Sequence, residues 1–234
     1  MGRILKAYET RFRWLLEQVH ARQLQRGVDC LVARARRRSL AGTIPLSQAL
    51  TEIFEEVSAH PSFRDENTAP APERFFCDAG LGGLARWLRA AGYETLWEAG
   101  INDNALLDRA RQSSATILTT DSMLMERRLL RDRIIPAYWL PPTMKIPEQL
   151  SLVFKELKLT IAEPRCMNCG GELRRGDKEA LREQIPPKTY HWLDEYFVCT
   201  RCDKLFWRGT HWQRIQRGLQ AARGGTKDKP HASK

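Results

Sequence analysis

The sequence contains no long apolar segment. Among its 234 residues, no uninterrupted apolar run approaches the roughly 20 residues that a membrane-spanning helix needs. The first residues also lack the apolar centre of a secretory signal. The stretch up to Arg38 is rich in arginine, as organelle transit peptides are, but it contains Glu9, Glu17 and Asp29, and transit peptides avoid acidic residues. We therefore expect a cytoplasmic protein without a membrane partner.

Cysteine is also scarce, and four of the six cysteines form two Cys-x-x-Cys pairs, Cys166–Cys169 and Cys199–Cys202. Two close thiol pairs separated by a longer segment are typical of tetrahedral zinc sites. The 29 residues between the pairs (170–198) exceed the usual spacing and predict a sizeable excursion. The sequence thus predicts a structural zinc ribbon, with redox dithiols as the alternative. We interpret Cys30 and Cys77 as small buried hydrophobic residues.

Acidic residues are outnumbered by basic ones. The chain has 38 Lys and Arg against 28 Asp and Glu, which gives a formal net charge of +10. Such an excess favours a polyanionic partner, nucleic acid before a membrane surface. A soluble protein with a merely basic surface is the alternative.

Residues 1–70 are predicted to form a basic helical region. Phe12, Leu15 and Val19 recur at spacings of three and four, as in a buried helical stripe. A further helix is expected over 47–59. Nothing in this region announces a function.

Prolines and short polar residues between 60 and 74 predict a linker. From 74 to 160, short apolar runs alternate with amphipathic helical patterns, which predicts a parallel sheet with right-handed crossovers in an α/β layer fold. The zinc ribbon is expected over 164–220 and a disordered tail over 221–234. The expected strands lie in the stretches RFFCDAG, YETLWEAG, ATILTTD and IIPAYWL.

Two of the predicted strands end in an aspartate. Asp78 closes the first strand and Asp121 the third, while Asp103 starts the helix that leads into the third. Ligands of open parallel sheets bind beyond the carboxyl ends of the strands, so we expect the three carboxylates to converge there. Clustered carboxylates repel one another unless a divalent cation neutralises them. Oxygen-only ligands suit Mg²⁺ or Mn²⁺.

A carboxylate metal site in a basic protein predicts a nuclease, because the cation polarises a phosphate and activates water. Each acid also has a plainer explanation. Helix capping is favoured for Asp103 taken alone and explains Asp121 equally well, whereas Asp78 is the hardest to explain structurally. Weaker candidates for a fourth ligand are Asp108, Glu126 and Asp132.

Five stretches carry a resemblance to a known family: FFCDAGLGGLARWLRAAGYETL, NDNALLDRA, TILTTDSML, RCMNCGGEL and FVCTRCDKLFWRGTHWQRI. Between about Arg74 and Gly218 the chain resembles the Mut-seven C-terminal RNase family, which is similar to PIN-domain nucleases with an appended zinc ribbon. The specific motifs are Asp-x-x-Leu-Gly-x-Leu-Ala-Arg-x-Leu-Arg, Leu-Thr-x-Asp and Trp-x-Gly-x-His-Trp. Residues 1–70 lie outside the resemblance.

The resemblance implies that Asp78, Asp103 and Asp121 bind the catalytic metal. It also implies that Arg86 and Arg89, which match the family's basic helix, face phosphates.

The chain departs from the family's strand-end motif at one position. Members of the family carry an arginine between the Thr and the Asp, where this chain has Thr120. If the family's arginine helps to bind RNA, its absence implies either weaker binding of RNA or binding by Arg127 or Arg128 in its place.

Aromatic and basic residues alternate around the second cysteine pair, among them Arg208, His211, Trp212 and Arg214. This composition is typical of a surface for single-stranded nucleic acid, where bases stack on rings and cations meet phosphates. Packing is the favoured role for Trp207, since small zinc modules have little core. His211 has three possible roles: to contact RNA, to replace a thiolate or to cap a turn, and the four cysteines make ligation the weakest.

The sequence predicts a divalent-metal-dependent ribonuclease with a PIN-like α/β domain, a basic helical N-terminal region and a C-terminal zinc ribbon that assists RNA binding. Zn²⁺ is structural and Mg²⁺ or Mn²⁺ catalytic in this interpretation. The alternative is a non-catalytic RNA- or ribosome-binding protein that retains the fold.

Overall fold

The computed structural model describes residues 2–61 and 71–224. It divides into two compact units, one of residues Met1–Pro70 and Thr119–Met144, the other of Ala71–Leu118 and Lys145–Lys234. Most of the linker predicted between 60 and 74 lies outside the described residues. The segment 119–144 belongs to the same unit as the N-terminal helices. No pattern in the sequence predicted this grouping.

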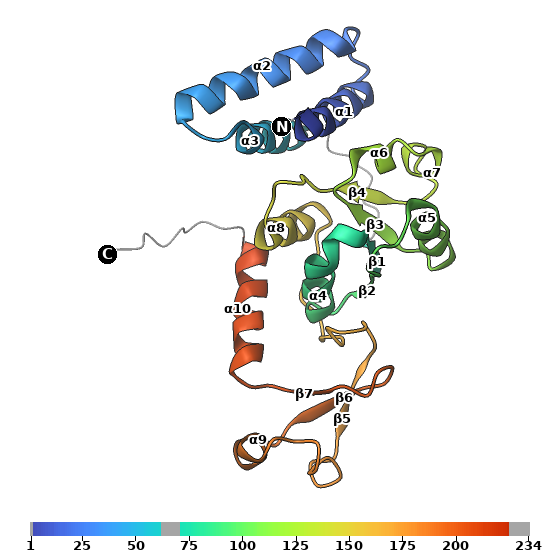
Figure 1. Cartoon of the computed structure of the whole chain (residues 1–234), viewed down its shortest axis with the longest axis vertical. Helices are drawn as coiled ribbons and strands as arrows, with labels where there is room; N and C mark the ends of the chain where they lie inside the picture. The colour runs from blue at the N-terminus through green and yellow to red at the C-terminus, as the bar shows by residue number, and fades with distance from the viewer. Residues whose placement is uncertain (1, 62–70, 225–234) are drawn as a thin grey trace. The chain divides into compact units, whose positions relative to one another are not determined.

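The first unit is built on three helices, α1 (Gly2–Gln18), α2 (Leu24–Gly42) and α3 (Leu46–Ser58), which lie against one another (Figure 1). Its other elements are α6 (Ser122–Met125), α7 (Arg128–Arg131) and β4 (Ala137–Trp139). Of the predicted helical stripe, Phe12 is fully and Leu15 almost fully covered, whereas Val19 is half-buried and follows the end of α1. The arginine-rich part of α2 faces outward, and Arg34 and Arg38 pair with Glu56 of α3.

An aromatic cluster joins the N-terminal helices to the 119–144 segment. The rings of Tyr8 and Phe54 pack edge-on against Trp139, with ring centroids 5.5 and 5.0 Å away. The Tyr8 hydroxyl is also within hydrogen-bond distance of Thr51 and Thr143, at 2.6 and 3.3 Å. These contacts explain why the two segments form one unit.

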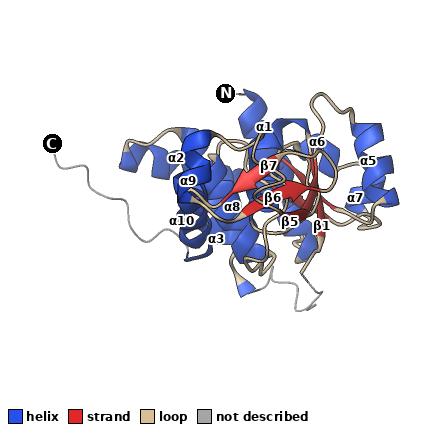
Figure 2. Ribbon diagram, turned by 90° about the horizontal axis from the view of Figure 1, so that it is seen from below, coloured by secondary structure: helices blue, strands red, loops and turns tan. Residues whose placement is uncertain are grey.

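The second unit contains most of the parallel sheet and the ribbon. The elements around the parallel sheet are β1 (Arg74–Cys77), η2 (Ala79–Leu81), α4 (Gly82–Ala90), β2 (Glu94–Leu96), α5 (Asp103–Gln112), β3 (Thr116–Thr119) and α8 (Ile146–Glu156). The ribbon side contains β5 (Leu173–Gly176), α9 (Pro187–Trp192), β6 (Tyr196–Cys199), β7 (Leu205–Trp207) and α10 (Thr210–Gly224). Figure 2 shows the mixed helix and strand content.

The strand order of the larger sheet is β2-β1-β3-β4. Strand β1 pairs in parallel with β2 and with β3, and the register sets Phe76 against Leu96 and Cys77 against Leu118. The apolar residues of β1 and β3 are fully buried, as expected for strands covered on both faces. The predicted α/β fold with a parallel sheet flanked by helices is confirmed.

Helix α10 connects the ribbon back to the helices beside the parallel sheet. It packs against α8 (Figure 1). It also meets α4, where a Cβ added at Gly218 would lie only 2.6 Å from the Trp87 ring. Because α10 runs to Gly224, residues 221–224 are helical, contrary to the predicted disordered tail. Residues 225–234 lie outside the described residues.

Two further points bear on the expectations. Cys77 is buried as predicted, but Cys30 is exposed on α2, so its interpretation as a buried hydrophobic residue was wrong. In the described part of the chain, no helix has the length and apolar character needed to cross a membrane.

Gly92 ends α4 in the left-handed region, with φ of +102°, as the sequence predicted for the stop of this helix. We expect Gly92→Ala to lower the free energy of unfolding by about 2–4 kcal/mol, since the backbone is strained for alanine and the new Cβ would meet the Glu163 carbonyl oxygen at 2.7 Å. Urea denaturation measures this loss.

Gly100 provides the matched control. Its φ is +71°, but nothing lies within 4 Å of an added Cβ, so Gly100→Ala should cost only about 1 kcal/mol. Equal losses in the two variants would show that the contact with residues 162–163 is unimportant.

Candidate functional site: a cysteine cluster, a basic cleft and strand-end acids

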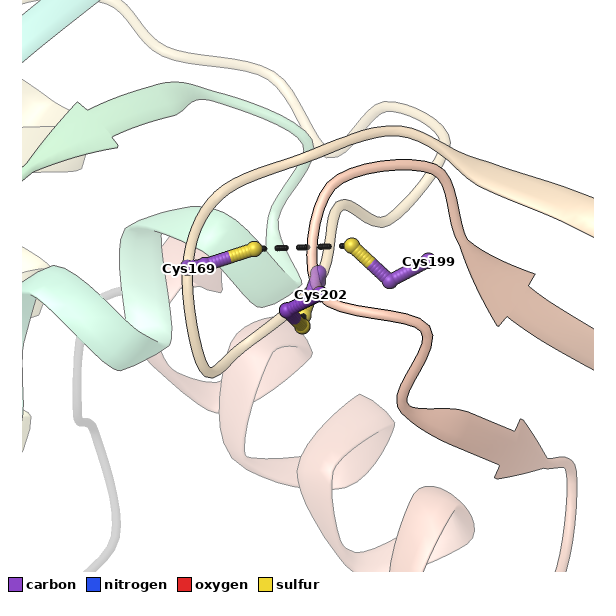
Figure 3. A group of neighbouring side chains, drawn as sticks. Cys169, Cys199 and Cys202 are labelled. Atoms are coloured by element: carbon purple, nitrogen blue, oxygen red, sulfur yellow. Dashed lines mark hydrogen bonds between the residues drawn. The ribbon is translucent and has the colours of Figure 1, made fainter.

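The ribbon brings its four cysteines together at two turns. Strands β5, β6 and β7 form an antiparallel sheet in that order. Cys166 and Cys169 precede β5, while Cys199 and Cys202 flank the turn between β6 and β7. The four Sγ atoms lie within 4.8 Å of one another, and those of Cys166 and Cys202 are 3.6 Å apart. Figure 3 shows Cys169, Cys199 and Cys202, with the 3.4 Å contact between Cys169 and Cys199 dashed.

These separations fit a metal site and not disulfides. A disulfide bond is about 2.05 Å long, and all four thiols are free. Thiolates at about 2.3 Å from a tetrahedral zinc ion lie roughly 3.8 Å apart. The two short contacts join different Cys-x-x-Cys pairs, whereas a redox dithiol would pair its cysteines within one motif. The four cysteines are positioned to bind a metal ion, and their chemistry suits zinc.

The protein surroundings of the thiols differ. Burial raises the pKa of Cys166 to about 12, whereas the backbone N–H of Lys204 lowers the pKa of Cys202 to about 7. The backbone N–H of Arg201 also lies 3.4 Å from Cys199 Sγ. Gly171 permits this crowding, because a Cβ there would come within 2.8 Å of the same sulfur. Amide donors stabilise thiolates, which are the form that a metal binds.

Arg89 joins the first cysteine turn to the parallel sheet. Its guanidinium is buried, with Nε donating to the Thr95 carbonyl at 2.8 Å and Nη1 to the Asn168 and Met167 carbonyls at 2.7 and 3.2 Å. Burial lowers the pKa of Arg89. The resemblance implied that Arg89 faces phosphates, whereas Nε and Nη1 of its guanidinium donate to these backbone carbonyls. The sequence carried no signal for these contacts, because they depend on how the first cysteine turn folds back onto α4.

A second link involves Glu94 of β2. It pairs with Arg74 at 2.8 Å and with Arg201, between the second cysteine pair, at 3.6 Å. Burial acts to raise the pKa of Glu94, but the hydrogen bond from Arg74 and the nearby charges, including Arg165, hold it below its ordinary value. The sheet and both cysteine turns are therefore connected by polar contacts.

Two of the strand-end aspartates cap short helices. Asp78 follows β1, and its Oδ1 accepts from the Gly80 N–H at 2.9 Å, at the start of η2. Asp121 accepts from the Met123 N–H at 2.7 Å and caps α6, which was one of its two predicted roles. Asp103 does not cap α5, because Asn102 accepts from Ala105 instead. The capping role favoured for Asp103 was therefore wrong, and its carboxylate is exposed in the first turn.

The acids belong to different parts of the chain: Asp78 and Asp103 to the second unit, Asp121 to the first. Within the described ranges, the cysteines are the one group of three or more Cys, His, Asp or Glu whose ligand atoms come within 4.8 Å of one another. The weaker acidic candidates are all exposed: Asp108 lies on α5, whereas Glu126 and Asp132 directly follow α6 and α7. Asp132 pairs with Arg128 and Arg131.

A cleft of about 1270 Å³ lies within the second unit, between η2 and α4 on one side and the ribbon and the start of α10 on the other. We call it the ribbon cleft. Its lining includes Arg86, Arg208, His211 and Trp212, all predicted to bind RNA, and Arg89. Arg214 lies on α10 outside the lining, and Arg127 and Arg128 belong to the first unit.

The ribbon cleft also contains residues that sequence reasoning missed. Trp207, interpreted as a packing residue, is 36% exposed and lines the cleft. Trp97 does so as well, and its position directly after β2 was the available signal. Arg165 and Phe197 carried no signal, because their contribution depends on how the ribbon folds back.

A model of the Mut7-C RNAse domain family matches residues 73–219. The chain belongs to this family. The matched range begins next to β1, covers the three aspartates and the four cysteines, and ends within α10. It excludes the N-terminal helices. Comparisons with curated proteins and with solved structures gave no match.

The cysteine cluster predicts one zinc ion per chain in purified protein. Cys199→Ser should lose most of it, because a thiolate ligand is removed. Cys30→Ser, at an exposed cysteine of α2, should keep it. Elemental analysis of the three proteins measures the metal, and metal-free wild type with two disulfides would contradict the assignment.

Replacing Arg89 should destabilise the second unit. Arg89→Met leaves the Thr95, Met167 and Asn168 carbonyls without their donor, and we expect a loss of about 3 kcal/mol in urea denaturation. Arg86→Met, one turn earlier on the exposed face of α4, should stay within about 0.5 kcal/mol of wild type. Equal stabilities of the two variants would refute the tethering role.

Proposed function

We propose that this protein is a divalent-metal-dependent ribonuclease that hydrolyses phosphodiester bonds of RNA. Membership of the Mut7-C RNAse domain family supports a nuclease-type activity. The register of the sheet supports the proposed site. Cys77 pairs with Leu118, so Asp78 leaves β1 at the level where β3 ends, and Asp121 follows three residues after Leu118 in the sequence. We take this carboxyl edge as the active edge.

Asp78, Asp103 and Asp121 are the proposed ligands of Mg²⁺ or Mn²⁺. Asp103 fits this role because it is exposed and Asn102 relieves it of capping. Asp78 and Asp121 each use Oδ1 for a backbone N–H, which fixes the orientation of the carboxylate. Bound metal would polarise the scissile phosphate and activate water. The side chains would hold that metal and orient the strand.

The basic residues supply the contacts with RNA. Arg86, Arg208, His211 and Trp212 line the ribbon cleft, and Arg214 lies further along α10. Arg127 and Arg128 follow Asp121 and are the proposed replacements for the arginine that the family carries at Thr120. We do not assign phosphate binding to Arg89. Contacts of this kind position the RNA and do not read its sequence.

A non-catalytic RNA- or ribosome-binding protein is the second candidate. Two observations favour it: Asp78 and Asp121 both have capping roles, and Thr120 replaces an arginine of the family motif. In both functions the ribbon holds Zn²⁺ for structural purposes. Its free thiols suit a reducing compartment such as the cytoplasm.

Cleavage assays separate the two functions. With Mn²⁺, wild type should cut single-stranded or structured RNA, and Asp78→Asn should be slower by about 100-fold or more, because a metal ligand is lost. Asp29→Asn, at an exposed position on α2, is the matched control and should cut normally. Equal cutting by wild type and Asp78→Asn would exclude the proposed site, and no cutting by wild type would favour the binding protein.

A further inference from the structure

We infer that the ribbon cleft holds an unpaired RNA strand, with bases stacked on its aromatic side chains, and leads that strand to Asp78. This inference rests on the proposed function and adds the class of substrate. It is carried by the aromatic faces in the cleft, by its excess of positive charge and by its continuity with the end of β1.

The aromatic lining is accessible. Trp97 and Trp207 are 37% and 36% exposed, and Phe206 and Trp212 are half-buried. Trp97 is fixed by its N–H, which donates to the Ala79 carbonyl at 3.0 Å. Its ring lies over Gly82, where an added Cβ would come within 2.6 Å. The lining therefore includes a rigid ring beside the start of α4, as a stacking platform requires.

The charges of the lining are unbalanced. Five of its residues are arginine or lysine and one, Glu163, is acidic. Arg89 and Arg165 donate to backbone carbonyls, and Arg208 lies 3.9 Å from Glu163. The side chains of Arg86 and Lys204 are exposed and have no hydrogen-bond or ion-pair partner within residues 2–61 and 71–224. These two cations are available to phosphates.

Stacking selects unpaired RNA. In a duplex the base faces are covered by neighbouring bases, so the rings of a protein reach only bases that are single-stranded or splayed out. At about 1270 Å³ the cleft also exceeds the roughly 300–1,000 Å³ of a small-molecule pocket. A segment of several linked nucleotides matches both the size and the mixture of rings and cations.

The cleft is continuous with the proposed active edge. Ala79 and Gly80 form part of its lining and directly follow Asp78. Asp78 accepts a hydrogen bond from Gly80, so the carboxylate and the cleft wall belong to one turn. A strand held between Trp97 and Trp207 therefore leaves the cleft at η2, beside the first strand-end acid.

Fluorescence anisotropy with a labelled 12-nucleotide unpaired RNA and a blunt hairpin of equal length tests the inference. Zinc-loaded protein without added Mg²⁺ or Mn²⁺ separates binding from cleavage. We expect the unpaired RNA to bind at least about 10-fold more tightly than the hairpin. Trp207→Ala should weaken this binding by about 10-fold, since stacking contributes strongly for each base.

Matched controls keep the result specific. Trp192→Ala removes a tryptophan that is 84% exposed on α9 and outside the cleft lining, and should bind as wild type. Lys204→Gln should reduce the slope of log affinity against log salt by about 0.7, as expected when one phosphate contact of a single strand is lost. Arg37→Gln, on the exposed face of α2, should leave the slope unchanged. Zinc content and circular dichroism verify that each variant is folded.

Equal binding of the hairpin and the unpaired RNA would overturn the inference, as would wild-type behaviour of both Trp207→Ala and Lys204→Gln. Selective binding of unpaired RNA without cleavage would support the cleft as the binding site and contradict the proposed ribonuclease activity. Cleavage by wild type together with unaltered binding by the cleft variants would support the ribonuclease and contradict the cleft as the binding site.

Discussion

The buried guanidinium of Arg89 is the contact on which the second unit depends. It lies where three pieces of chain meet: its own helix α4, strand β2 at Thr95, and the first cysteine turn at Met167 and Asn168. Burying a cation costs free energy that only good hydrogen bonds offset. Arg89 meets this condition with three carbonyl acceptors. Its own carbonyl accepts from the Arg165 N–H, which adds a fourth bond at the same place.

The position of Arg89 links the cysteine cluster to the ribbon cleft. The turn that contributes Cys166 and Cys169 to the cysteine cluster also contributes Met167 and Asn168 to the wall of the ribbon cleft. On the same side of the cleft, Lys204 presents its backbone N–H to Cys202 and belongs to the cleft lining. Metal geometry and cleft shape are thus determined by the same short segments. A metal ion bound by the four cysteines would in this way affect the shape of the ribbon cleft.

Local patterns in the sequence predicted what local physics determines. The alternation of apolar runs and helical stripes gave the parallel sheet, and the spacing of the cysteines gave their cluster. Gly92 was correctly identified as a helix stop. The errors arise where a residue's role depends on a distant partner. In the sequence, nothing distinguishes Arg89 from a surface arginine, and its burial depends on contacts with the first cysteine turn. Trp207 was interpreted as a packing residue because small zinc modules have little core, but it lines the ribbon cleft.

The division of the chain has the same origin. Periodicity indicated that α1 and α3 bury a stripe, but it did not indicate that Tyr8 and Phe54 pack on Trp139. Such a contact links positions more than 80 residues apart, which no local pattern encodes. Local patterns can also fail for neighbouring residues. Asn102 and Asp103 are equally good N-caps by residue type, and the backbone geometry makes Asn102 the cap of α5.

Because α10 packs against α4 and α8, the ribbon and the parallel-sheet part of the second unit cannot change independently in evolution. A zinc ribbon is often regarded as a cassette that is exchanged between proteins. Here Gly218 accommodates Trp87, Glu94 pairs with Arg201, and Gly92 lies against Glu163, so each face of the ribbon is matched to a particular nuclease-side residue. A ribbon transferred from another protein would lack the residues that match Trp87, Glu94 and Gly92. The two halves of the second unit are therefore expected to diverge together, as co-varying pairs across one interior.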